Sequence, residues 1–95
     1  MRRAAKIDEN QAQIVSALRR MGATVASLAS VGNGVPDLLV GYRGVNHLME
    51  VKDGAKVPSA RKLTPAELEF HAKWRGTVHV VESLGDAMKI IGVTK

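Results

Sequence analysis

Two apolar segments joined by a short turn are the feature that most restricts how this chain can fold. The first covers residues 37–42 and the second covers residues 45–52, with an Arg-Gly turn at residues 43–44. A two-residue turn closes an antiparallel hairpin and sets which residues face each other. With this turn at the centre, the numbers of paired residues add up to 87, which is also the sum for Asp37 and Glu50. The sequence therefore predicts that these two carboxylates lie opposite each other.

Two carboxylates in opposite positions repel each other unless a cation neutralises them. Mg²⁺ and Mn²⁺ are hard cations that prefer carboxylate oxygens and water as ligands. Side chains alternate along a strand, so Lys52 shares a face with Glu50. A lysine in that position could contact a scissile phosphate or an attacking water. The pattern predicts metal-dependent cleavage of a phosphodiester, with Asp37, Glu50 and Lys52 as the catalytic residues.

A plainer interpretation of the same residues stays open. Pro-Asp is a frequent turn dipeptide, and Glu-x-Lys on one strand face is often only a solvated ion pair. The order of the segments favours the catalytic interpretation. A glycine-containing turn leads into Pro36-Asp37 and an apolar strand, and after the hairpin turn a second apolar strand carries Glu50 and Lys52.

The composition of the 95-residue chain restricts its chemistry and its partners. The absence of cysteine excludes disulfides, thiolate metal sites and cysteine nucleophiles. A net charge of +5 and a pI near 10.0 favour a polyanionic partner such as DNA. Aromatic residues make up only 3%, which argues against base stacking as the main mode of recognition. We recognise no signal peptide and no membrane-spanning run, so we expect an intracellular protein without a membrane partner.

The whole chain, residues 1–95, reads as one α/β domain with the element order α-β-β-β-α-β-α. The third and fourth strands flank a helix, which predicts a parallel pair and therefore a mixed sheet. In the first half of the chain we expect a basic flexible arm at 1–6, a helix from an Asp8 cap to Gly22, and strands at 24–29, 37–42 and 45–52. A mobile loop at 53–62 follows. The second half should contain a helix that begins with a Thr64-to-Glu67 capping box and runs to about Trp74, a strand at 77–81, and a helix from a Ser83 cap to about Ile91.

This pattern resembles the PD-(D/E)XK nuclease superfamily, which has a restriction-endonuclease-like core with a mixed β-sheet flanked by helices. More narrowly, it resembles a stand-alone VRR-NUC (virus-type replication-repair nuclease) domain of the phage or bacterial type. The resemblance covers residues 8–90. The residues that carry it are Gly34-x-Pro36-Asp37-Leu38, Glu50-Val51-Lys52 and Leu63-Thr64-Pro65.

The resemblance implies a role for each matching residue. Asp37 and Glu50 would bind Mg²⁺ or Mn²⁺, and the backbone carbonyl of Val51 would be a further ligand. Lys52 would orient or activate the attacking water and stabilise charge in the transition state. The bound metal would polarise the phosphodiester and lower the pKa of its water ligand.

The family often places one more acid on the first helix, and here that position is ambiguous. Glu9 and Gln13 are one turn apart on a single helical face, and either could be the accessory residue. A neutral Gln13 would weaken a second metal, so one-metal and two-metal chemistry both stay open. For Glu9 we favour the simpler role of a charge that stabilises the start of the helix.

Basic residues near the predicted site are the candidates for DNA binding. Lys56, Arg61 and Lys62 belong to the loop that follows the Glu-x-Lys strand, and Arg2 and Arg3 belong to the arm. All of them could contact phosphates. A solvated loop that makes no DNA contact is the alternative.

Stand-alone members of the family are similar to Holliday junction resolvases and act as homodimers. A two-fold dimer would supply the two related cuts that a four-way junction needs. The resemblance thus implies a homodimeric, structure-selective endonuclease of repair or recombination, in the cytoplasm of a bacterial or phage-infected cell. The alternatives are cleavage of flaps or linear duplex, or a non-catalytic basic DNA-binding module. Candidate residues for the dimer surface are Leu68, Phe70, Trp74, Ile90 and Ile91.

Overall fold

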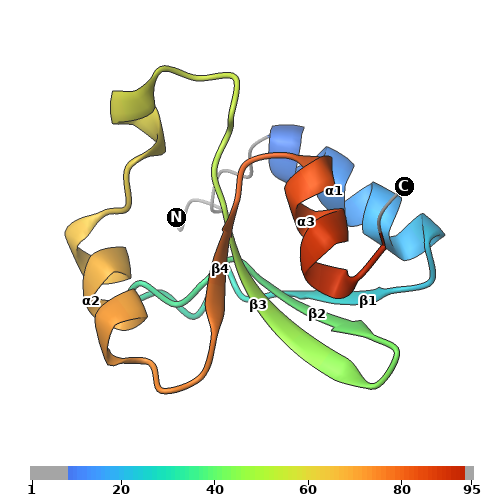
Figure 1. Ribbon diagram of the computed structural model, residues 1–95. Coiled ribbons are helices and arrows are strands. Elements are labelled where there is room, and N and C mark those ends of the chain that lie inside the picture. Colours follow the sequence, from blue (N-terminus) through green and yellow to red (C-terminus); the bar gives the residue numbers. More distant parts are fainter. Residues whose placement is uncertain (1–8, 94–95) are drawn as a thin grey trace, which may run out of the picture.

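A mixed four-stranded sheet with helices on both faces forms the protein in the computed structural model, which describes residues 9–93 (Figure 1). The predicted order of helices and strands is confirmed. Within the described range, no helix is both long enough and apolar enough to cross a membrane. The elements are α1 (Glu9–Arg20), β1 (Thr24–Ser27), β2 (Leu38–Tyr42), β3 (Val45–Val51), a short 3₁₀ helix (Pro58–Arg61), α2 (Pro65–Lys73), β4 (Val78–Val81) and α3 (Leu84–Ile91).

The sheet has the strand order β1-β2-β3-β4, and its pairings confirm the predicted topology. β1, β2 and β3 are successively antiparallel, whereas β3 and β4 are parallel and are connected through α2. The β2–β3 hairpin has the predicted register, since Leu38 pairs with Met49 and Tyr42 pairs with Val45. The turn residues have left-handed φ values of 50° at Arg43 and 81° at Gly44. Such a turn matches the right-handed twist of paired strands, which explains why this short turn sets the register.

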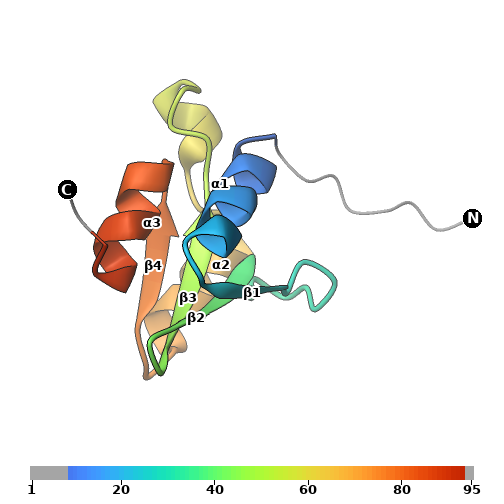
Figure 2. The same cartoon turned by 90° about the vertical axis from the view of Figure 1, so that its right-hand side faces the viewer.

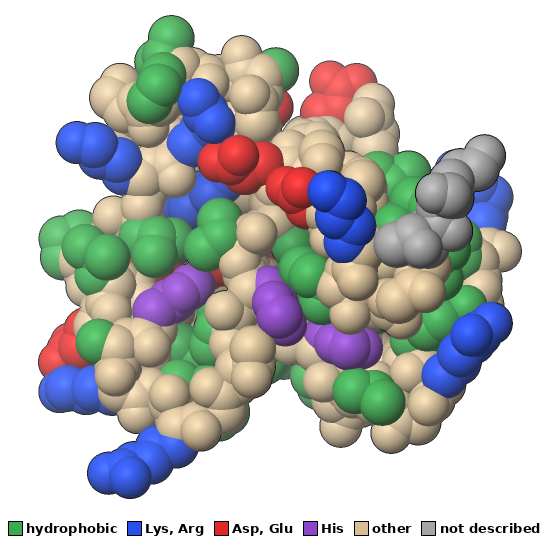
Figure 3. Space-filling model, in the orientation of Figure 1, with side chains coloured by type: hydrophobic (Ala, Val, Ile, Leu, Met, Phe, Trp, Pro, Cys, Tyr) green, Lys and Arg blue, Asp and Glu red, His purple; other side chains and the backbone are tan. Residues whose placement is uncertain are grey.

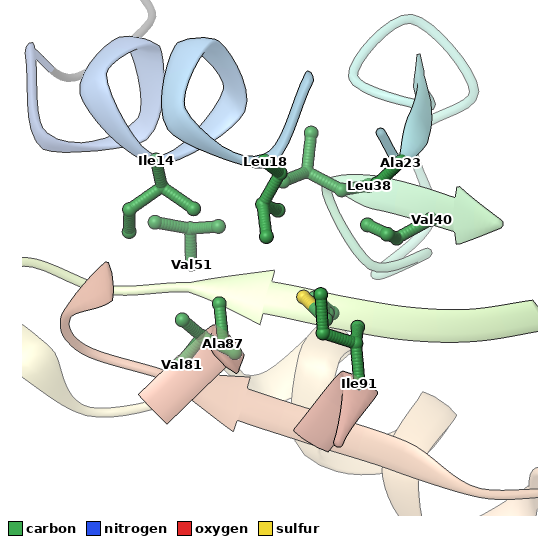
Figure 4. Packing of buried hydrophobic residues seen from close by; sticks show 10 residues of the cluster. Ile14, Leu18, Ala23, Leu38, Val40, Val51, Val81, Ala87 and Ile91 are labelled. Carbon is green, nitrogen blue, oxygen red and sulfur yellow. The ribbon is translucent and has the colours of Figure 1, made fainter. Parts of the chain in front are cut away.

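The two faces of the sheet are covered differently. α1 and α3 lie together on one face, and α2 lies on the other (Figures 1 and 2). The buried apolar core lies between the sheet and the α1–α3 layer, where alternate strand residues meet the apolar faces of both helices (Figure 4). The residues of this core are Ile14, Leu18, Ala23, Leu38, Val40, Met49, Val51, Val81, Ala87 and Ile91. No residue of α2 is buried, so α2 is the least packed of the three helices.

Helix ends follow the capping signals in the sequence. The Thr64 hydroxyl accepts a hydrogen bond from the Glu67 N–H, and the Glu67 carboxylate accepts one from the Thr64 N–H, which confirms the predicted capping box. At α3 the Ser83 hydroxyl accepts from the Asp86 N–H, and the helix ends at Gly92 with a φ of 90°. The predicted Asp8 cap and the 1–6 arm lie outside the described residues.

Two predictions about the surface need correction. The segment 53–62 is not entirely loop, because a 3₁₀ helix forms at Pro58–Arg61, where proline sets the backbone angle and Arg61 contacts Glu82. The assignment of Ile90 and Ile91 to a dimer surface is wrong. Ile91 belongs to the core and Ile90 packs against it, because α3 is amphipathic and turns this face towards the sheet.

Candidate active site

Asp37 and Glu50 lie at the same end of the hairpin, as its register requires. Asp37 directly precedes β2, and Glu50 is the second-last residue of β3. The Asp37 side chain extends the strand pairing, because its Oδ2 accepts a hydrogen bond of 2.8 Å from the Val51 N–H. The Asp37 carbonyl accepts a second bond of 2.8 Å from the Leu28 N–H. These contacts hold the Asp37 carboxylate beside β3.

Glu50 is a buried carboxyl group without full hydrogen bonding. Its side chain is 2% exposed and, by strand alternation, projects from the α2 side of the sheet, opposite to Met49 and Val51. Among the described residues its Oε1 has no hydrogen-bond partner, and its Oε2 lies 3.8 Å from Lys52 Nζ. Burial, followed by the nearby Asp37 and Glu67 carboxylates, raises the pKa of Glu50 to about 9. A buried oxygen without a partner is costly, so this atom favours a cation.

Lys52 lies between two acids, and one of them is a residue that the sequence did not assign to the site. Lys52 Nζ is 2.9 Å from Glu67 Oε1 and 3.8 Å from Glu50 Oε2. Burial alone would lower the pKa of Lys52, but its hydrogen bond and ion pair with Glu67 raise the pKa above the ordinary value. Lys52 is therefore an ammonium ion at neutral pH.

Glu67 and Asn10 also belong to the site, although the sequence did not predict either of them there. The capping box explained Glu67 locally, and nothing in the spacing showed that α2 begins beside Lys52. Asn10 holds the other side of the β3 end, where its Nδ2 donates to the Lys52 carbonyl at 2.9 Å. A polar residue in the first turn of a predicted helix was the only signal for Asn10, and it is a weak one.

The two candidates for the accessory position lie on an exposed face of α1. Glu9 and Gln13 are exposed on α1, and neither forms a hydrogen bond or ion pair with Asp37 or Glu50 within the described part of the chain. The buried polar residue of α1 is Gln11, which is 8% exposed. Gln11 lies between the two candidates in sequence and thus on the opposite face of the helix.

The basic residues beyond β3 differ in their surroundings. Lys56 and Lys62 are exposed, whereas Arg61 Nη1 is 3.3 Å from Glu82 Oε2. Figure 3 shows Lys and Arg side chains gathered over this segment, at the upper left of the view. Arg2 and Arg3 lie outside the described residues. Lys56 and Lys62 therefore have the freedom to contact phosphates, and Arg61 would first have to leave its carboxylate.

The turn before Asp37 packs directly against the start of α2. Gly34 has a φ of 78°, and a Cβ atom at this position would meet the Ala66 carbonyl and come within 2.9 Å of the Glu67 nitrogen. This close approach connects the two chain segments that carry Asp37 and Glu67. Only glycine combines the left-handed backbone with so short a distance.

We expect Gly34→Ala to destabilise the protein by about 3 kcal/mol, because it combines left-handed backbone strain with a clash against backbone atoms. Gly32→Ala is the matched control. Gly32 has a φ of 77° but no atom within 4 Å of an added Cβ, so we expect a cost of about 1 kcal/mol. Urea unfolding of both variants measures the difference. Equal free energies of unfolding would show that the contact between the turn and α2 has no importance for stability.

The residues present fit a divalent cation. Glu50 Oε1 is buried and free, and Asp37 uses only one of its two oxygens for the Val51 N–H. Residues 9–93 contain no cluster of three acidic, histidine or cysteine side chains with metal-ligand geometry. Side-chain ligation would thus come from two carboxylates, which suits Mg²⁺ because this ion commonly retains several waters.

Comparison with known proteins identifies the family. No family model matches the chain, and no match was found among curated proteins. A solved structure described as a "VRR_NUC domain" is 33% identical in sequence, with 85% of this chain and 88% of that chain covered and a TM-score of 0.61. This identity over most of both chains confirms the resemblance seen in the sequence. The protein therefore belongs to the VRR-NUC family, whose members are nucleases of the PD-(D/E)XK type.

Proposed function

We propose that this protein is a divalent-metal-dependent DNA endonuclease with its active site at Asp37, Glu50 and Lys52. Glu50 carries the proposal. It is a buried carboxyl with an unpartnered oxygen, next to a second carboxylate and 3.8 Å from an ammonium group. Such a group lowers the stability of the fold unless a ligand compensates for it, and a divalent cation does so directly. Family membership supports phosphodiester hydrolysis as the reaction.

The metal ligands are Asp37, Glu50 and the Val51 carbonyl in this proposal. The N–H and C=O groups of one strand residue point to the same side, and the Val51 N–H already points to Asp37. The carbonyl of Val51 is thus directed to the same edge of β3. A bound Mg²⁺ or Mn²⁺ ion would polarise the phosphodiester and lower the pKa of a water ligand. Glu50 would release its proton when the metal binds, because a carboxyl group ligates as the carboxylate.

Lys52 acts as a cation in this mechanism. Its ammonium group has three donors and no free lone pair, so it donates to a phosphate oxygen and stabilises the negative charge that develops there. Its raised pKa argues against a role as general base at neutral pH. With Glu9 and Gln13 exposed, we propose one-metal chemistry with these three residues.

The DNA substrate and the assembly belong to the same proposal. The net charge of +5 and the exposed Lys56 and Lys62 beyond β3 support DNA as the partner. We favour a four-way junction, cut by a homodimer in the cytoplasm of a bacterial or phage-infected cell. Leu68 on α2 is 56% exposed, and Trp74, which directly follows α2, is 47% exposed and stacks on Phe70 at 5.0 Å between ring centroids. Exposed apolar residues of this kind support a dimer contact at α2.

The test of this function is cleavage of a labelled four-way junction and of linear duplex, each with Mg²⁺, Mn²⁺ or EDTA. We expect metal-dependent, symmetric cuts in the junction. Lys52→Ala is expected to lower the rate by roughly 1,000-fold, because it removes a charge that stabilises the transition state. Cleavage of the linear duplex alone would show that the four-way junction is not the substrate. Tight DNA binding without cleavage under every metal would reject the nuclease function.

We expect Leu68→Glu to convert the proposed dimer into a monomer, since a charge in an apolar contact is costly and Leu68 is too exposed for the change to unfold the protein. Val45→Glu is the control, because Val45 is 54% exposed but lies at the far hairpin end. Sedimentation at micromolar concentration, with and without junction DNA, gives the oligomeric state. A wild-type monomer under both conditions would contradict the dimer.

A further inference from the structure

One oxygen of Glu67 has two hydrogen-bond donors from different parts of the chain. Glu67 Oε1 accepts from the Thr64 N–H at 2.8 Å and from Lys52 Nζ at 2.9 Å. The Glu67 side chain is 17% exposed and the Lys52 side chain is 14% exposed, so the contact is largely shielded from water. A short contact of this kind, between partners held on a strand and at a helix start, is stronger than a surface ion pair.

This contact adds to the packing of Gly34 against Ala66 at the start of a helix that is otherwise loosely packed on the sheet. None of the α2 residues is buried, and a cavity of about 560 Å³ separates its last turn from the sheet. Leu39, Leu48, Phe70 and Trp74 are among the residues that line this cavity. The Glu67 carboxylate is therefore the main polar connection between α2 and the end of β3 within residues 9–93.

Lys52 needs such a contact to be held in one place. Its side chain has four rotatable bonds, and its other acidic neighbour, Glu50, is 3.8 Å away, beyond hydrogen-bond distance. Without Glu67, the ammonium group would have no hydrogen-bond acceptor among the described residues that holds it near Asp37 and Glu50.

We propose that Glu67 is a positioning residue that holds the Lys52 ammonium group beside the two carboxylates and couples its placement to the start of α2. The kinetic consequence of this inference rests on the proposed nuclease function, whereas the contact itself does not. The position of the Lys52 ammonium group depends on an oxygen acceptor at Glu67 Oε1, and a glutamine amide can also provide this acceptor. Glu67→Gln therefore keeps the placement of Lys52, and Glu67→Ala removes it.

Three variants separate positioning from helix capping. Glu67→Ala removes both the cap and the contact with Lys52, whereas Thr64→Ala removes the reciprocal hydroxyl bond and leaves the carboxylate in place. We expect Glu67→Ala to lower kcat on junction DNA by about tenfold or more with KM within about twofold, since a displaced catalytic group costs rate rather than binding. Glu67→Gln and Thr64→Ala should stay within about threefold of wild type. An equal loss of kcat in Glu67→Ala and Thr64→Ala, assayed well below their melting temperatures, would show that Glu67 acts only as a cap.

Chemical labelling of the metal-free protein tests the contact without any cleavage. We expect Lys52 to be reductively methylated several-fold faster in Glu67→Ala than in wild type. Glu67→Gln should lie between the two, because its amide keeps the hydrogen-bond acceptor but removes the charge that raises the pKa of Lys52. Lys73, which is 75% exposed and pairs with Glu69, is the internal control and should not change. Equal labelling of Lys52 in wild type and Glu67→Ala would overturn the inference. A wild type that does not cleave DNA but shows the expected labelling would reject the nuclease function and leave the positioning role intact.

Discussion

Glu50→Gln is expected to abolish cleavage and, at the same time, to make the metal-free protein more stable. The loss of a metal ligand should lower the cleavage rate by roughly 1,000-fold or more. The metal-free protein becomes more stable because Glu50 is a buried acid with an unpartnered oxygen and a strongly raised pKa. A neutral amide removes the cost of keeping this group protonated. We expect the free energy of unfolding to increase by about 2 kcal/mol near pH 7, which corresponds to roughly 10 °C in melting temperature for a domain of this size.

The stability difference should depend on pH with a definite sign. The pKa of Glu50 is about 9 in the folded protein, against an ordinary value of 4.5. Between these values the unfolded chain has lost the Glu50 proton and the folded protein still binds it. Wild type therefore loses stability relative to Glu50→Gln as the pH rises from 4.5 towards 9. The two proteins should have similar stabilities below this window.

Thermal unfolding in EDTA from pH 5 to pH 9 measures this effect, with Glu69→Gln as the control at an exposed acid. Addition of Mn²⁺ should stabilise wild type and leave Glu50→Gln unchanged, because only a folded site with both carboxylates binds the metal well. Melting curves of wild type and Glu50→Gln that stay parallel at every pH would contradict the assignment of Glu50 as a destabilised metal ligand.

Asp37→Asn is expected to abolish cleavage and to preserve DNA binding. An asparagine oxygen can still accept from the Val51 N–H, so the hairpin end should keep its structure. The variant loses a metal-binding charge, and the rate should fall by roughly 1,000-fold or more. It also loses a negative charge beside the phosphates, so DNA affinity in EDTA should stay the same or increase.

Asp53→Asn is the matched control for this prediction. Asp53 lies just beyond β3, and its Oδ1 accepts from the Ala55 N–H within the same loop. Cleavage assays and fluorescence anisotropy on one junction substrate compare both variants with wild type. Equal cleavage by Asp37→Asn and wild type would remove Asp37 from the metal site.

The hairpin and its carboxylate pair could be predicted from the sequence because both depend on local rules. A two-residue turn sets the strand register, and side-chain alternation then decides which residues share a face. The capping box at Thr64, the Ser83 cap and the helix before the parallel strand are local in the same sense. Asp37, Glu50 and Lys52 follow from these rules without any knowledge of distant contacts.

Residues whose role depends on packing between distant segments could not be predicted in the same way. Gln13 and Glu9 matched a family position by spacing alone, but the rotation of α1 against the sheet exposes both and buries Gln11. The apolar Ile90 and Ile91 looked like a possible interface, and the docking of α3 placed them in or against the core. Helical periodicity gives a face, but it does not give the neighbour of that face.

By itself, the sequence determined the order of elements, the hairpin register and the opposition of two acids near a lysine. These features depend on turn geometry and strand periodicity, which act over a few residues. Only the tertiary structure decided that Glu50 is buried with a free oxygen and that Glu67 reaches Lys52 from the other side of the site. Burial and contacts between segments 15 residues apart depend on how the helices pack on the sheet, and no local rule contains that information.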